Sequence, residues 1–104
     1  MRRVLIHVVD GDPRRAARVA TNALAQRDDV SIEIVLQGPV IDAVTAPAVW
    51  LSELPANTTL LVCANSLNTF GLDHSDIVAP AAVIPAAVAH IAEAQWAGAA
   101  YVRV

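Results

Sequence analysis

Charged residues are scarce in this sequence, and neither sign of charge forms a strong cluster. Asp, Glu, Lys and Arg make up 16% of the 104 residues, against roughly 25% in an average soluble domain. The net charge is -3, and acidic residues elsewhere offset the basic residues Arg2, Arg3, Arg14, Arg15 and Arg18. Because a nucleic-acid-binding domain concentrates basic residues on one face, we expect no nucleic-acid partner.

Long hydrophobic runs are also missing. No stretch approaches the roughly 20 apolar residues that a membrane-spanning helix needs. The apolar run near the N-terminus is short and ends in the polar segment 10–13, which does not fit a signal peptide. We therefore expect a cytoplasmic protein without a membrane partner.

Phosphate-binding and metal-binding motifs are absent as well. The chain has no Gly-x-Gly-x-x-Gly after its first apolar run and no Gly-Lys-Ser/Thr sequence, so we reject nucleotide binding. Asp73, His74 and Asp76 are metal-ligand types, but one short loop rarely supplies a full coordination shell. We expect a solvated loop there, and neither a metal nor a cofactor.

Only one cysteine, Cys63, is present. A lone cysteine cannot form an intramolecular disulfide, so the fold does not depend on oxidation. It also lacks a resolving partner in its own chain, which disfavours a stable intramolecular redox switch.

What the chain does have is an excess of apolar residues, 56% of the total. A length of 104 residues suits a single domain, 1–104, with one core. Such a composition provides more apolar surface than a small core hides, so we expect burial against further copies of the chain, in a homo-oligomer.

The pattern along the chain alternates strands with helices. We predict strands at 4–9, 30–36, 58–63, 82–84 and 99–104, and helices at 13–26 and 85–97. Between residues 40 and 54, Pro47 divides the apolar pattern into two short helices. Alternation of this kind predicts βαβ units in a three-layer α/β/α fold with a mostly parallel five-stranded sheet.

The stretch Leu60-Leu61-Val62-Cys63-Ala64-Asn65 is the main candidate for a site. It has the pattern of a buried parallel strand, and ligands gather at the carboxyl ends of such strands. We expect Asn65 to cap a short helical turn that ends at Gly71. A thiol beside a helix N-terminus is favoured as the thiolate, although a free cysteine is also among the most buried residue types.

Cys63-Ala64-Asn65 after an apolar strand resembles the signature of the DsrE-like family of small sulfur-relay proteins. Three further segments resemble that family in the same order: 4–9, its first strand; 32–38, its second strand and glycine turn; and 95–102, its closing helix and strand. The resemblance covers nearly the whole chain. It implies the DsrE-like α/β fold, a persulfide carried on Cys63, sulfur donor and acceptor proteins as partners, and assembly as a trimer or hexamer.

Three other residues are candidates for the same site. His7 lies on the first strand, which we expect to neighbour the strands that end at Gly38 and Cys63, so it could deprotonate the thiol. A lone histidine among apolar neighbours is also a common core residue. Gly38 would supply a left-handed turn and leave room beside Cys63 as a pocket wall, and the Asn65 amide could contact a bound group. On the last helix we expect His90 to be exposed.

These observations leave three hypotheses open. The first is a sulfur-relay or persulfide-carrier protein that accepts sulfane sulfur on Cys63 and passes it to a partner thiol. The second is a non-catalytic oligomeric module that binds a small ligand or a protein, with Cys63 only lining a pocket. The third is an enzyme that uses Cys63 as a nucleophile on a small thiol or carbonyl compound.

Overall fold

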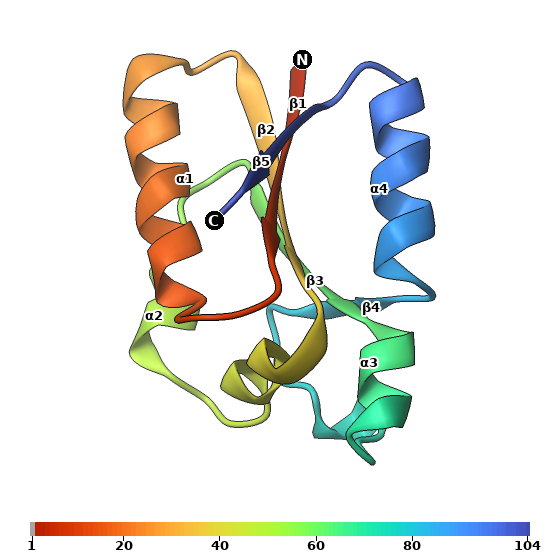
Figure 1. Cartoon of the computed structure of the whole chain (residues 1–104). Helices are drawn as coiled ribbons and strands as arrows, with labels where there is room; N and C mark the ends of the chain where they lie inside the picture. Colours follow the sequence, from red (N-terminus) through yellow and green to blue (C-terminus); the bar gives the residue numbers. More distant parts are fainter. Residues whose placement is uncertain (1) are drawn as a thin grey trace.

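The computed structural model describes residues 2–104, which form one five-stranded parallel sheet flanked by helices (Figure 1). The strand order is β4-β3-β2-β1-β5, and every neighbouring pair is parallel. The strands are β1 (Arg2–Val8), β2 (Val30–Leu36), β3 (Thr58–Cys63), β4 (Ala82–Ile84) and β5 (Ala100–Arg103). The predicted fold class, a three-layer α/β/α arrangement around a parallel five-stranded sheet, is confirmed.

Helices cover both faces of the sheet because alternate strand residues point to opposite faces. The helix α1 (Arg14–Gln26), the 3-10 helix η1 (Gly38–Val44) and the short helix α2 (Val49–Ser52) enclose the larger core with residues such as Ile6, Ile34 and Val62. The helix α4 (Ala87–Trp96) packs on the other face against Leu5, Val35 and Cys63. Figure 1 shows α1 and α4 on opposite sides of the sheet.

The predicted element boundaries differ from the observed ones mainly at strand and helix starts. The first strand begins at Arg2 rather than at Val4, because Arg2 and Arg3 continue the pairing with β2. The last helix begins at Ala87 rather than at Pro85, since Ala86 is still extended. Pro47 lies between η1 and α2, as predicted for a residue that interrupts a helix.

Two further elements complete the chain: α3 (Ala64–Thr69), directly after β3, and the 3-10 turn η2 (His74–Asp76). Figure 1 shows α3 and η1 beyond the same end of the sheet, where the strands have their carboxyl ends. Within residues 2–104, no helix has the length and apolar character needed to cross a membrane.

Candidate functional site

The carboxyl ends of β2 and β3 bring Gln37, Gly38 and Cys63 to one place. Val35 pairs with Leu61 and Leu36 pairs with Val62. Gln37 continues the extended conformation of β2, so the same register places it beside Cys63, on the face covered by α4. Gly38 follows Gln37 at this end of the sheet, but a Cβ on Gly38 would meet the carbonyl oxygen of Val9 and no atom of Cys63 within 4 Å, so its role as a pocket wall beside Cys63 stays a prediction.

Cys63 is the N-cap residue of α3, and its thiol lies beneath the first turn of α4. The backbone N–H of Ala87 donates a hydrogen bond to Cys63 Sγ at 3.3 Å. Only 2% of Cys63 is exposed to solvent. The thiol is thus a buried group with a polar contact to the start of α4.

The surroundings of Cys63 favour its ionised form. Burial raises the pKa of Cys63, but the N–H groups of Ala87, Ser66 and Asn65 and the hydroxyl of Ser66 lower it, and the net pKa lies below that of an ordinary cysteine. The cause is that amide groups at the starts of α3 and α4 direct their N–H bonds toward the sulfur. A thiolate on Cys63 is consequently stabilised by these N–H and hydroxyl donors.

Ser66 links the glycine turn to this cysteine. The Gly38 backbone N–H donates to Ser66 Oγ at 2.8 Å, and Ser66 is only 8% exposed. Because Oγ accepts that bond, its own proton remains free to be donated toward the sulfur. Gly38 has a φ of +78°, and a Cβ there would lie 3.4 Å from the carbonyl oxygen of Val9. Gly38 therefore supplies the predicted left-handed turn and, through its N–H, orients Ser66.

The prediction that Asn65 caps α3 is wrong. The helix begins two residues earlier than predicted, at Ala64, so Cys63 holds the N-cap position and Asn65 lies within the first turn with an exposed side chain. Asn65 contributes to the site through its backbone N–H, which helps to lower the pKa of Cys63. Gly71 does adopt the predicted left-handed conformation, with a φ of +68°.

His7 does not partner Cys63. The sheet order places β2 between β1 and β3, so the predicted adjacency of the first strand to the cysteine-bearing strand is wrong. His7 Nε2 instead lies 2.8 Å from Gln37 Oε1, and His7 Nδ1 lies 2.7 Å from the Tyr101 hydroxyl. His7 is thus the middle member of a row of three side chains, and Gln37 is the member nearest to the cysteine.

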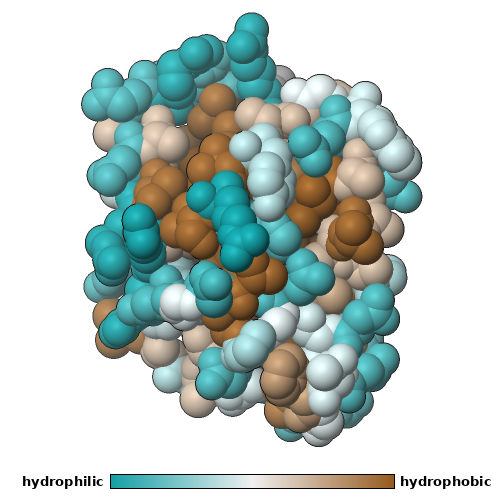
Figure 2. All heavy atoms as spheres, in the orientation of Figure 1, coloured by the Kyte–Doolittle hydropathy of each residue, from teal (hydrophilic) through white to brown (hydrophobic). Residues whose placement is uncertain are grey.

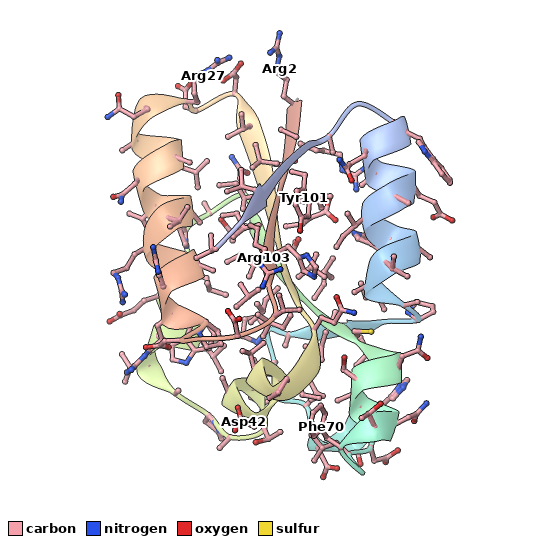
Figure 3. All side chains as sticks on the ribbon, in the orientation of Figure 1. Arg2, Arg27, Asp42, Phe70, Tyr101 and Arg103 are labelled. Atoms are coloured by element: carbon pink, nitrogen blue, oxygen red, sulfur yellow. The ribbon has the colours of Figure 1, made fainter. Side chains whose placement is uncertain are left out.

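These three side chains form part of an open pocket of about 250 Å³ between the sheet and α4. Its remaining walls come from α4, and the full lining is His7, Gln37, Val88, Ile91, Gln95 and Tyr101. Cys63 is not part of this lining, although it packs beneath the same helix. Figure 3 shows Tyr101 on β5, near the middle of the molecule and facing the space between β5 and α4.

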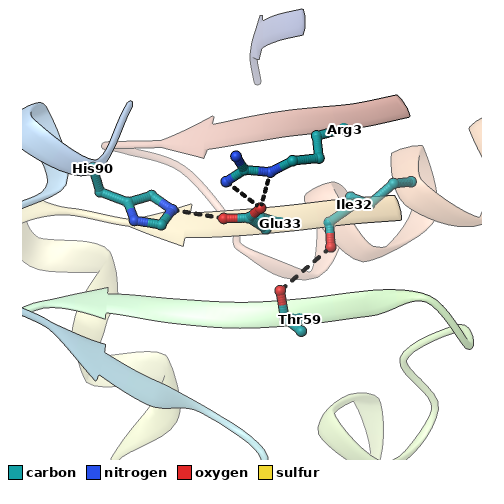
Figure 4. Close-up of polar contacts among 5 residues, drawn as sticks. All are labelled: Arg3, Ile32, Glu33, Thr59 and His90. Carbon is teal, nitrogen blue, oxygen red and sulfur yellow. Dashed lines mark hydrogen bonds and ion pairs between the residues drawn. The ribbon is translucent and has the colours of Figure 1, made fainter. Parts of the chain in front are cut away.

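His90 is not exposed, contrary to the prediction. Its Nε2 atom lies 2.6 Å from Glu33 Oε1, and Arg3 contacts the other carboxylate oxygen through Nε at 2.9 Å and Nη2 at 2.8 Å (Figure 4). Burial raises the pKa of Glu33, but the hydrogen bonds from His90 and Arg3 lower it, and the net pKa is below the ordinary value. This contact fastens α4 to the middle of the sheet.

The loop at residues 73–76 has a structural role. Asp73 and Asp76 form a capping box. The Asp73 side chain accepts the backbone N–H of Asp76, and the Asp76 side chain accepts the backbone N–H of Asp73. Ser75 Oγ donates to Asp73 Oδ2 at 2.7 Å. Among residues 2–104, no three His, Cys, Asp or Glu side chains come together in a way that would hold a metal ion.

Sequence reasoning missed Ser66, Gln37 and Tyr101 as site residues. Ser66 lies three positions after Cys63, the N-cap residue of α3. A side chain at this position of a helix can hydrogen-bond back to the N-cap residue. No comparable signal marks Gln37 and Tyr101, since they meet His7 only through the order of the strands.

The chain is similar along its whole length to a solved structure whose function is unknown. This is MTH1491 from Methanobacterium thermoautotrophicum, which superposes with a TM-score of 0.82 at 26% sequence identity, with 100% of both chains covered. No family model matches the chain, and its sequence matches no curated protein. The comparison supports the α/β fold over the full length of the chain.

Proposed function

We propose that the protein is a sulfur carrier that accepts sulfane sulfur on Cys63 and passes it to the thiol of a partner protein. The main support is the lowered pKa of Cys63, produced by N–H groups from two helix starts and by Ser66. The resemblance of the strand-end Cys63-Ala64-Asn65 to the DsrE-like signature supports the same proposal.

The proposed chemistry needs no cofactor. The Cys63 thiolate attacks the outer sulfur of a donor persulfide, the S–S bond of the donor breaks, and the donor leaves as a thiolate. A thiolate of the acceptor then attacks the outer sulfur of the Cys63 persulfide, and Cys63 leaves as the thiolate. The N–H groups that favour the thiolate also stabilise Cys63 as the leaving group. A free thiol carrier requires a reducing compartment, so the proposal places the protein in the cytoplasm.

The burial of Cys63 adds a requirement to this proposal. A donor reaches the sulfur only after the first turn of α4 shifts away from the end of β3, since Ala87 lies against Sγ. We propose that donor and acceptor proteins accelerate this shift when they bind at the end of the sheet, and that α4 also opens slowly without them. A small donor alone then depends on the spontaneous opening of α4.

Intact mass after exposure to an inorganic polysulfide tests the carrier function. We expect the native protein to gain the mass of one sulfur atom, reversibly by a thiol reductant, and Cys63→Ala to gain none. The urea-unfolded wild-type protein shows that the donor is competent. If the unfolded chain reacts and the native chain does not, even with prolonged exposure, the carrier proposal fails.

A second candidate function rests on the burial of Cys63 and on the open pocket beside it. In this reading the protein is a non-catalytic oligomeric module that binds a small ligand or a protein, and the cysteine is a packing residue. Cys63→Ala would then retain every binding property, whereas the carrier proposal requires that sulfur uptake and transfer be lost.

We also propose that the protein forms a homo-oligomer, as a trimer or hexamer. Large apolar side chains outside the pocket lining are exposed in the single chain, including Trp96 at 83% on α4 and Val102 on β5. Figure 2 shows hydrophobic surface around the position of β5, interrupted by hydrophilic side chains. Exposed apolar surface of this kind is typical of a region that another chain covers.

A further inference from the structure

The pocket between β1, β5 and α4 has the features of a binding site that is separate from the thiol chemistry. Its polar side chains come from three different segments: His7 from β1, Gln37 from the end of β2 and Tyr101 from β5. Holding such side chains in one row costs conformational entropy. Small-molecule sites characteristically combine apolar walls with a few convergent polar groups of this kind.

The direction of the hydrogen bonds in this row follows from Gln37. Its Oε1 atom only accepts hydrogen bonds, so His7 Nε2 carries the proton and donates it across 2.8 Å. The Nδ1 atom of a neutral imidazole then accepts, and the Tyr101 hydroxyl donates to it across 2.7 Å. The ring of His7 is thereby fixed in one tautomer, with both of its nitrogens occupied.

Two groups of this row remain available to a ligand. The Tyr101 hydroxyl donates its hydrogen bond to His7, so its oxygen is left with lone pairs and acts as an acceptor toward a ligand. The Gln37 amide NH₂ presents two donors, and within residues 2–104 no protein group accepts from them. The pocket therefore presents an acceptor and a donor on either side of His7.

The other walls restrict the ligand further. Val88 and Ile91 of α4 are apolar, Gln95 is neutral, and none of the lining residues that the structure describes is Asp, Glu, Arg or Lys. A charged ligand would lose water there without gaining an ion pair. A volume of about 250 Å³ corresponds to about eight water molecules, which suits a single ring with one substituent.

We propose that this pocket binds a small, uncharged, planar molecule with a neighbouring hydrogen-bond donor and acceptor, such as a ring carboxamide. Its donor faces the Tyr101 oxygen, its acceptor faces the Gln37 NH₂, and its ring packs against Val88 and Ile91. This proposal does not depend on sulfur transfer at Cys63, so it stands or fails separately from the carrier function.

Titration with benzamide, followed by amide chemical shifts in NMR, tests the proposal. We expect saturable shifts in β1, β5 and α4, and an affinity for benzoate at least about tenfold lower, since the carboxylate meets no cation. Tyr101→Phe keeps the ring and removes the oxygen, and should weaken benzamide binding by about five- to tenfold. Its spectrum reports whether the fold is retained.

A matched pair of surface variants isolates the apolar wall. Val88→Lys places a charged side chain at the pocket and should abolish benzamide binding. The control is Val49→Lys, which changes a valine of α2 on the opposite side of the sheet. The two valines are almost equally exposed, Val49 at 72% and Val88 at 73%. No saturable shift with benzamide, equal binding of benzoate, or unchanged binding in both Tyr101→Phe and Val88→Lys would overturn the proposal.

Discussion

At the scale of single residues, the state of Cys63 is decided by a balance between burial and hydrogen bonding. Burial raises the pKa of the thiol, and the surrounding N–H groups with the Ser66 hydroxyl outweigh it. The lone cysteine therefore differs from an inert core cysteine, although its exposure is equally low. Ser66 is the one side chain among these donors, which makes it the residue to change.

We expect Ser66→Ala to raise the pKa of Cys63 and to slow its alkylation at neutral pH, because a donor to the thiolate is removed. The variant should also lose about 1–3 kcal/mol of stability, since the Gly38 N–H loses its acceptor. The measurements are the pH dependence of the alkylation rate and urea unfolding. Thr69→Ala is the matched control, because its hydroxyl donates only to the exposed backbone of α3. Equal pH profiles for all three proteins would contradict the role assigned to Ser66.

At the scale of elements, α4 covers both the thiol and one wall of the pocket. Its main polar attachment to the sheet is the contact of His90 with Glu33, which Arg3 completes. Its other contacts with the sheet are the hydrogen bond from the Ala87 N–H to Cys63 Sγ and apolar packing through Ala87, Ile91 and Ala94. Access to Cys63 should therefore depend on how firmly this helix is attached.

His90→Ala should increase the labelling rate of Cys63 in the native protein by about tenfold, because α4 opens more often once its polar contact is lost. Alkylation followed by mass spectrometry measures this rate. Glu93→Ala is the control, since Glu93 is exposed on the same helix. If His90→Ala and the wild type label at the same rate, reagents reach the thiol by a route that does not involve α4.

The carboxylate of Glu33 should make stability depend on pH at the acidic end. Its pKa is lowered in the folded chain, so its contribution is fully present above the ordinary carboxyl pKa of about 4.3 and is lost as the pH falls through the folded-state value. We expect Glu33→Gln to be about 1–3 kcal/mol less stable at neutral pH. Its difference from the wild type should shrink on acidification. A constant difference across this range in urea unfolding would contradict this prediction, because it would show that the pKa of Glu33 is the same in the folded and unfolded chains.

At the scale of the whole molecule, hydrophobic residues make up 56% of the chain, and the few helices have to cover both faces of one sheet. The larger core is closed by α1, η1 and α2, but α4 alone covers most of the other face. Four of the six large apolar side chains that are exposed among residues 2–104 lie on α4 and β5, and the other two are Val49 on α2 and Phe70 after α3. This distribution supports contact between copies through that side.

Trp96→Glu should shift the protein toward monomers in light scattering coupled to size-exclusion chromatography, because a buried unpaired carboxylate at an interface is unfavourable. Phe70→Glu is the matched control, since Phe70 is also exposed but follows α3 at the far end of the sheet. A stable assembly should persist at protein concentrations on the order of tens of micromolar. A wild-type protein that is monomeric at such a concentration would contradict the proposed oligomer.

The sequence by itself determined the elements and their type. Short apolar runs predict the strands, and Gly38, Gly71 and Gly98 predict the turns after β2, α3 and α4, because these patterns act over a few residues. The position of Cys63 at a strand end followed from the same local information. The predicted start of α3 was wrong by two residues, because the local pattern favoured Asn65, the better capping residue type, over Cys63.

Only the tertiary structure decided which side chains meet. The order β4-β3-β2-β1-β5 separates His7 from Cys63 and joins it to Tyr101, 94 positions away in the chain. It also places Glu33 beneath His90, which local pattern predicted to be exposed. The physical reason is that strand order and helix cover are selected by burial over the whole core, which no short segment of sequence contains.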